Sequence, residues 1–234
     1  MLFRSAGYSQ FSVVARESVV KIDADLPMET AVLFGCAVMT GVGAVVNTAR
    51  VAAGTSVAVF GAGGVGLSAI MGAKAVGAWP IIAIDRVTSK LELATRCGAT
   101  HIVNAGETDP VAAVRDLTRG GVDTAFEAVG DEKVIAQAFA ATRRGGRTVA
   151  IGLTHPDRML TIPALTVTAE ERILMGSYMG SCVPQRDIPR FIAMYRAGLL
   201  PVDLLRSSLI ALDEVNAAFD LLDRGEVARQ VIRF

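Results

Sequence analysis

Short apolar runs alternate with amphipathic segments through the middle of the chain, separated by Gly-rich turns. The apolar runs predict strands at 56–60, 81–85, 101–103, 123–127, 148–152 and 173–177. The amphipathic segments predict helices at 65–76, 89–97, 110–118 and 132–141. Apolar strands that are each followed by a helix are typical of a parallel sheet covered on both faces. The pattern therefore predicts an α/β fold with a doubly wound, parallel, six-stranded sheet.

The two ends of the chain do not continue this pattern. At the start, residues 8–14 and 19–22 are expected to form short strands. Towards the end we expect a helix at 188–196, a strand near 208–210, a helix at 212–222 and a last strand at 229–234. The helix at 212–222 has two acids in its first turn, and Gly225 follows its end.

Residues 31–49 carry no charge, and this length could just span a bilayer. The segment contains glycines, threonines and an asparagine, and no basic cluster flanks it to set an orientation. We therefore expect a helix buried inside a soluble protein rather than a membrane span.

The composition indicates which kinds of binding partner and which cellular compartment to expect. Lys and Arg number 23 and Asp and Glu number 23, so no overall field attracts nucleic acid or an anionic membrane. The three cysteines, Cys36, Cys97 and Cys182, are too few and too widely spaced for a disulfide framework. The first 20 residues carry no signal peptide pattern, so a reducing cytoplasm is expected.

A G-x-G-x-x-G motif at Gly61, Gly63 and Gly66 follows the first predicted strand and opens a helix. The first glycine permits a tight turn, the second lets a pyrophosphate approach the backbone, and the third lets the helix pack on the strand. The helix N-terminus at Gly64 then offers free N–H groups to the phosphates. This arrangement is the phosphate loop of a Rossmann domain.

The second predicted strand ends in Asp85, 19 residues after Gly66. A carboxylate at this place accepts hydrogen bonds from an adenosine ribose and repels a 2′-phosphate, which favours NAD over NADP. Arg86 is the kind of neighbour that an NADP site recruits, so it argues in the other direction. Lys90 lies one helical turn further on and is either a ribose contact or a solvated lysine.

Several segments together resemble one enzyme family: 35–44, Gly54-Thr55, the glycine loop, 126–130, 145–147, 176–180 and 229–231. They are similar to zinc-dependent medium-chain alcohol dehydrogenases, and most of all to the class III branch of glutathione- or mycothiol-dependent formaldehyde dehydrogenases. The resemblance covers essentially the whole chain. It implies NAD and a catalytic zinc ion as cofactors.

The resemblance also implies roles for individual residues. Cys36 matches one of the three protein ligands of the catalytic zinc, although a buried structural thiol is the alternative. Thr40 matches a residue that lines the nicotinamide site. The positions that match the nicotinamide and pyrophosphate contacts are Val65, Ile151, Gly152, Ser177, Met179 and Arg229. Ile151 and Arg229 have a simpler interpretation as a core strand residue and a surface charge.

One departure from the family concerns the zinc. A catalytic zinc needs three protein ligands, and the family takes the other two from an N-terminal domain. The remaining candidates, His101, His155, Cys97 and Cys182, have no recognisable ligand spacing to Cys36. We therefore expect a chain that lacks the N-terminal catalytic domain. Its expected parts are a remnant of that GroES-like domain (1–36), the Rossmann domain (37–177) and a segment that returns to the catalytic domain (178–234).

The expected function is the cofactor-binding portion of an NAD- and zinc-dependent dehydrogenase that transfers hydride from an alcohol, or an aldehyde adduct, to NAD. The chain alone is expected to have little activity. One alternative is a non-catalytic NAD(H)-binding protein or a truncated, inactive product. A second is a relative of the zinc-free quinone reductases, which Cys36 disfavours. A third is a methyltransferase. By resemblance, the complete enzyme is a homodimer or homotetramer that pairs through residues 173–179.

Overall fold

The computed structural model describes residues 7–234, and its centre is a parallel six-stranded sheet with the strand order β3-β2-β1-β4-β5-β6. The strands are β1 (Val57–Phe60), β2 (Ile81–Asp85), β3 (His101–Asn104), β4 (Val122–Glu127), β5 (Thr142–Ala150) and β6 (Ile173–Gly176). The connecting helices are α3 (Gly64–Ala75), α4 (Thr88–Cys97), α5 (Pro110–Thr118), α6 (Glu132–Ala140) and α7 (Ala164–Ala169). This is the expected doubly wound fold, and only the short α7 was not anticipated.

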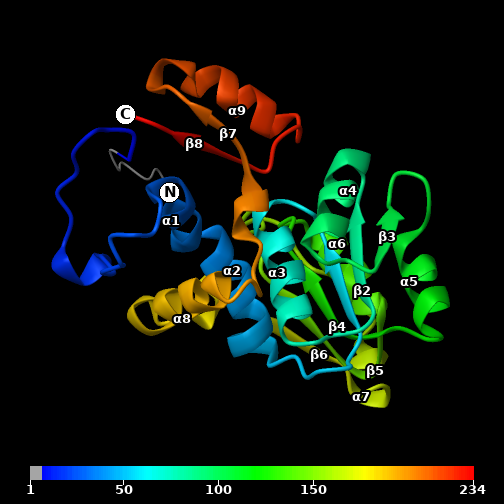
Figure 1. Cartoon of the computed structure of the whole chain (residues 1–234). Helices are drawn as coiled ribbons and strands as arrows, with labels where there is room; N and C mark the ends of the chain where they lie inside the picture. Colours follow the sequence, from blue (N-terminus) through cyan, green and yellow to red (C-terminus); the bar gives the residue numbers. More distant parts are fainter. Residues whose placement is uncertain (1–6) are drawn as a thin grey trace.

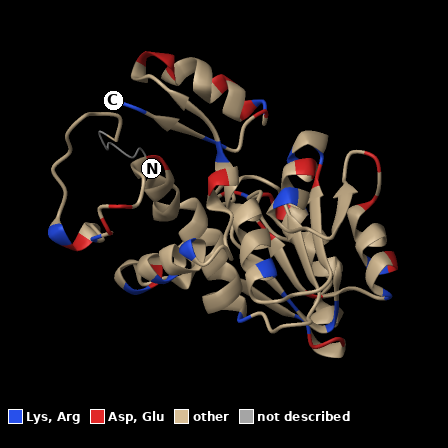
Figure 2. Ribbon diagram, viewed as in Figure 1, with Lys and Arg blue, Asp and Glu red and all other residues tan. Residues whose placement is uncertain are grey.

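Alternate residues of the central strands face two separate hydrophobic cores. Val57 and Val59 of β1 pack in the larger core with helices α3 and α4, whereas Ala58 and Phe60 face α5 and α6. All four side chains are buried. This two-sided burial is why the strand is a continuous apolar run in the sequence. Figure 2 shows that charged residues lie mainly on the outer helices and in the loops.

The uncharged segment 31–49 forms a broken helix that packs beside α3. It begins with α1 (Met28–Ala31) and a 3₁₀ turn (Val32–Gly35), bends at Cys36, and continues as α2 (Ala37–Gly43) and a π-helical turn (Ala44–Ala49). All of α2 is buried, as expected. No single helix within residues 7–234 is long and apolar enough to cross a membrane. The pair 28–35 and 37–49 is apolar enough when combined, but it is bent by 50°.

The C-terminal part of the chain first packs against α2 through residues 184–196 and then crosses the top of the molecule as viewed in Figure 1. Its helices are α8 (Pro184–Arg196) and α9 (Val215–Asp223), and its strands β7 (Arg206–Ile210) and β8 (Arg229–Ile232) pair in parallel as a second small sheet. Arg196 of α8 forms ion pairs with Asp23 and Asp25, and Arg233 forms one with Glu29. The two ends of the described chain are therefore tied to each other.

The expectation of strands at 8–14 and 19–22 is wrong. This segment is extended without pairing and contains one 3₁₀ turn, Arg16–Ser18. A strand needs a neighbour to satisfy its N–H and C=O groups, and none lies beside this segment among residues 7–234. Phe11 and Val13 are exposed at 89% and 104%, whereas Val20 and Ile22 are partly buried against the larger core.

Candidate functional site

The glycine loop between β1 and α3 has the geometry of a phosphate cradle. Gly61 has a φ of 95°, which favours glycine, and Gly63 is the N-cap of α3. A Cβ on Gly66 would overlap the carbonyl oxygen of Gly61, whereas a Cβ on Gly63 would meet nothing within 4 Å. Gly66 is thus required by the packing of the protein itself, and the space at Gly63 is open to a ligand.

Asp85 fastens this loop to the end of β2. One carboxylate oxygen accepts the N–H of Ala62 at 2.7 Å, and the other accepts the N–H groups of Arg86 and Val87 at 2.8 and 3.0 Å. The oxygen that accepts only the Ala62 N–H keeps lone-pair capacity for a further donor. The carboxylate therefore orders the loop and still faces the cleft beside it.

A cleft of about 570 Å³ lies at the carboxyl ends of β1, β2 and β4. The expected residues Gly61, Gly63, Asp85 and Lys90 all line it. In α/β sheets of this order, ligands bind at this place, where the strand order reverses. The structure thus brings the predicted phosphate-loop and ribose residues together.

The sequence did not reveal the far wall of this cleft. Residues 128–137, at the start of α6, form one part, and the turn 223–225 after α9 forms another. A Cβ on Gly225 would lie 2.8 Å from Lys90 Nζ, so the C-terminal turn closes over that lysine. Arg229 lies against the loop, with Nε 2.6 Å from the place of a Cβ on Gly64. The sequence suggested a cofactor contact only for Arg229, because the other contacts depend on tertiary packing.

The residues expected beside a nicotinamide lie at the neighbouring strand ends. Ile151 and Gly152 follow β5, and their N–H groups donate to the Glu127 carbonyl. Ser177 follows β6, is 4% exposed, and shares a hydrogen bond of 2.8 Å with the Thr48 hydroxyl. The other three expected residues are Thr40, buried in α2, Val65, half-buried in the first turn of α3, and Met179, which is 40% exposed. None of these six lines the 570 Å³ cleft.

Glu127 was not singled out from the sequence, although it lies at the centre of this sheet edge. Its side chain is fully buried, and Oε1 accepts the N–H groups of Val129 and Gly130 at 2.7 and 2.6 Å. Oε2 is buried with no hydrogen-bond partner in the described structure. Burial raises the pKa of this carboxyl, and the two backbone donors oppose the rise.

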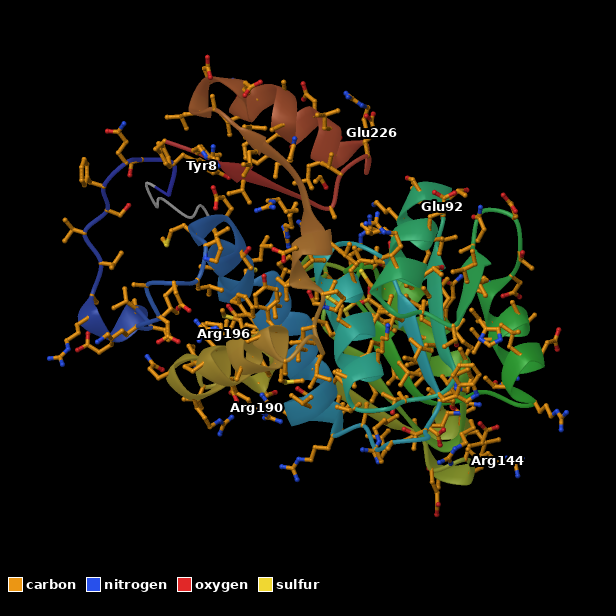
Figure 3. All side chains as sticks on the ribbon, viewed as in Figure 1. Tyr8, Glu92, Arg144, Arg190, Arg196 and Glu226 are labelled. Carbon is orange, nitrogen blue, oxygen red and sulfur yellow. The ribbon has the colours of Figure 1, made fainter. Side chains whose placement is uncertain are left out.

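A raised pKa in the folded state makes stability fall as pH rises through that pKa, because the native protein then binds more protons than the unfolded chain. We expect the unfolding midpoint of the wild-type chain to decrease, relative to that of Glu127→Gln, as the pH rises above the ordinary carboxyl pKa of 4.5. Denaturant unfolding over this rise in pH measures it. Glu92→Gln, on the exposed face of α4 (Figure 3), is the control. Parallel pH profiles for wild type and Glu127→Gln would contradict the assignment.

The environment of Cys36 does not form a metal site by itself. Cys36 is exposed at the bend before α2, and no three His, Cys, Asp or Glu side chains converge within residues 7–234. Burial raises the pKa of the Cys97 thiol to about 12 and that of Cys182 to about 11. His101 contacts the Thr100 hydroxyl, and His155 is an exposed loop residue near Asp157. The described residues therefore do not complete a zinc site with three protein ligands.

The chain matches known proteins over most of its length. The model of a family described as zinc-binding dehydrogenase matches residues 64–197. Alcohol dehydrogenase class-3 of Cereibacter sphaeroides is 36% identical over 237 residues, which cover 97% of this chain and 62% of that protein. S-(hydroxymethyl)glutathione dehydrogenase of Escherichia coli O1:K1 / APEC is 38% identical over 231 residues, covering 97% of this chain and 62% of that protein.

Solved structures give the same picture. The crystal structure of benzyl alcohol dehydrogenase from Acinetobacter calcoaceticus matches with a TM-score of 0.89 and 35% identity, covering 92% of this chain and 59% of that chain. The chain thus spans about 62% of the length of the curated relatives named above.

Proposed function

Because the chain belongs to the zinc-binding dehydrogenase family, we propose that it is the cofactor-binding portion of an NAD-dependent alcohol dehydrogenase. The observation that carries the proposal is the glycine loop fastened to Asp85 at the carboxyl edge of the sheet. The open space at Gly63 and the N-terminus of α3 suit a pyrophosphate, and Asp85 suits a ribose.

Each part of the site has its own task in this proposal. Gly63 and Gly64 let the phosphates approach the backbone, and Arg229 pairs with their charge. Lys90 and the turn at Gly225 hold the adenosine end. Val65, Ile151, Gly152, Ser177 and Met179 orient the nicotinamide and keep water from it. The bound nicotinamide supplies the hydride chemistry.

Cys36 and Thr40 are proposed to belong to the reacting end. Cys36 is the N-cap of α2 and Thr40 lies one turn into the helix, with its N–H donating to the Cys36 carbonyl at 2.9 Å. A thiolate at Cys36 suits zinc as a single ligand. Because the described residues complete no metal site, we assign no step of the reaction to the metal. The proposed division is a catalytic-domain part at 1–36, the NAD-binding domain at 37–177, and a returning segment at 178–234.

The proposed substrate is a small alcohol or an aldehyde adduct. Three unpaired cysteines fit a reducing compartment, so we place the protein in the cytoplasm. The edge strand β6 leaves Ile173 and Leu174 exposed at 42% and 38%. An apolar edge strand is a site for pairing, so we propose that two copies associate there. Sedimentation of the purified chain tests this association.

The first test is a calorimetric titration of the chain with NADH and, separately, with NADPH. The proposal expects saturable NADH binding and weaker NADPH binding, because the Asp85 carboxylate repels a 2′-phosphate. A folded chain that binds neither dinucleotide would overturn the proposal.

Asp85→Asn tests the choice of cofactor directly. The amide keeps the size of the side chain but loses its charge and one of its two acceptor atoms. We expect a loss of stability of about 1–2 kcal/mol, since at least one backbone N–H among Ala62, Arg86 and Val87 loses its acceptor. The ratio of NADH to NADPH affinity should narrow by about tenfold. An unchanged affinity ratio would show that Asp85 does not determine the choice between NADH and NADPH.

A second candidate function is a binding protein for NAD(H) without catalysis. The observation that favours it is that the glycine-loop cleft is lined by neither Cys36 nor Thr40. The two candidates differ in turnover. Because the cofactor-binding portion alone is expected to have little activity, turnover is measured on the longest form of the protein found in its source cells. NADH binding by that form without NAD reduction, with alcohol and zinc both supplied, would favour the binding protein.

A further inference from the structure

A second pocket, of about 550 Å³, lies where the C-terminal end of the segment 44–50 meets α8. Its lining is Val46, Asn47, Arg50, Ser181, Arg186 and Arg190. Three of these six residues are arginines, and none is acidic. The pocket shares no lining residue with the glycine-loop cleft.

Most of the positive charge in this pocket is not neutralised. Arg186 pairs with Asp187 through two hydrogen bonds, and this carboxylate is fully buried beneath the pocket. Arg50 and Arg190 make no ion pair with any carboxylate in the part of the chain that the structure describes. Arg147 lies nearby, donating to the Ala49 carbonyl at 2.8 Å, and adds to the field. The site thus carries a net positive charge.

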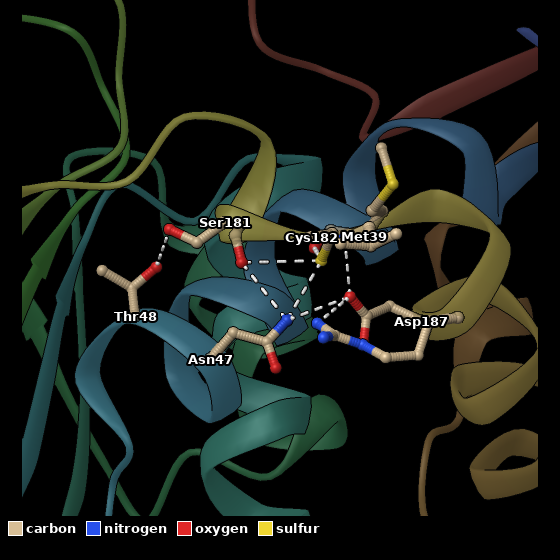
Figure 4. Close-up of polar contacts among 9 residues, drawn as sticks. Met39, Asn47, Thr48, Ser181, Cys182 and Asp187 are labelled. Carbon is tan, nitrogen blue, oxygen red and sulfur yellow. Dashed lines mark hydrogen bonds and ion pairs between the residues drawn. The ribbon is translucent and has the colours of Figure 1, made fainter.

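The wall of the pocket is fixed by contacts to α2 and to the turn after it (Figure 4). The amide nitrogen of Asn47 lies 3.3 Å from Cys182 Sγ and 3.4 Å from both the Gly180 carbonyl and an Asp187 oxygen. The hydroxyl of Thr48 bonds that of Ser181 at 2.8 Å. A Cβ on Gly180 would overlap the Met39 carbonyl oxygen, so the backbone at Gly180 packs directly against α2.

We propose that this pocket binds a small, multiply charged phosphate anion through Arg50, Arg186 and Arg190. Guanidinium groups match phosphate oxygens with paired, charge-assisted hydrogen bonds. The Ser181 hydroxyl supplies a neutral polar group at the wall of the pocket. The volume fits a small ligand, and a wall that is already ordered loses little entropy when the ligand binds.

Pyrophosphate is the probe, because it presents the chemistry without a nucleoside. It is titrated into the full chain at constant ionic strength and followed by calorimetry. Arg50→Gln combined with Arg190→Gln should weaken binding by about tenfold or more. Both side chains are exposed, so the fold should be kept, and the unfolding midpoint checks this. Arg186 is left in place, because its removal would leave the buried Asp187 carboxylate without its ion-pair partner.

Arg119→Gln is a matched control. Arg50 and Arg119 are both exposed arginines that follow a helix in the left-handed region, with φ of 51° and 56°. The control removes the same charge on the far side of the sheet, and it should leave the affinity within about twofold.

Arg229→Gln separates the two places where a pyrophosphate could bind. Retained binding in this variant, with loss in the Arg50 and Arg190 double variant, supports the second pocket. Loss in Arg229→Gln alone would assign the anion to the glycine loop and overturn the proposal. Absence of saturable binding by the wild-type chain would also overturn it. Each result is independent of whether NADH binds, so the cofactor proposal is judged separately.

Discussion

Gly66→Ala is expected to destabilise the chain by about 3 kcal/mol or more and to abolish measurable NADH binding. The added methyl would overlap the Gly61 carbonyl oxygen and lie 2.9 Å from its carbonyl carbon. Both obstacles are backbone atoms, so no side-chain rotation relieves them. Helix α3 would have to move away from β1, and the phosphate cradle would be lost with it.

Thermal unfolding measures the first effect, and a fall of roughly 10 °C in the midpoint is expected for a chain of this size. Gly35→Ala is a suitable control, because Gly35 lies outside the cleft and a Cβ there would meet nothing within 4 Å. A Gly66→Ala chain with wild-type stability would show that helix and strand are not packed as closely as described.

The six strands and the helices between them were predictable from the sequence because each strand is buried on both faces. A strand such as 57–60 is then apolar at every position, and Gly-rich turns mark its ends. The strand order follows from right-handed crossovers, which leave few alternatives for alternating strands and helices. The loop and Asp85 were predictable for a related reason, since both follow strand ends in sequence.

The unpredicted features depend on partners that are distant in the chain. The strands expected at 8–14 and 19–22 have suitable residues but no neighbouring strand among those described, so no ladder forms. The turn at Gly225 reaches Lys90 only because α9 folds back over the sheet edge. The cluster of Asn47, Cys182 and Asp187 likewise joins residues more than 130 positions apart. Periodicity and local motifs contain no information on such contacts.

Gly63→Ala is expected to separate ligand binding from folding, which Gly66→Ala cannot do. Gly63 has φ −78° and ψ −176°, a conformation that alanine adopts freely, and its Cβ would meet nothing within 4 Å. Gly63 is the N-cap of α3, and its replacement by alanine should lower the free energy of unfolding by less than about 1 kcal/mol. We therefore expect a nearly unchanged unfolding midpoint.

NADH binding by the same variant is expected to weaken by about tenfold or more, because the methyl group occupies space that a pyrophosphate needs. Calorimetric titration beside Gly35→Ala gives the comparison. A stable Gly63→Ala chain with wild-type affinity would mean that the dinucleotide does not approach the backbone here. A stable chain with lost affinity shows that the glycine is retained for a ligand and not for the fold, since the protein alone leaves that space open. The geometry of the loop would then reflect cofactor binding by this chain itself.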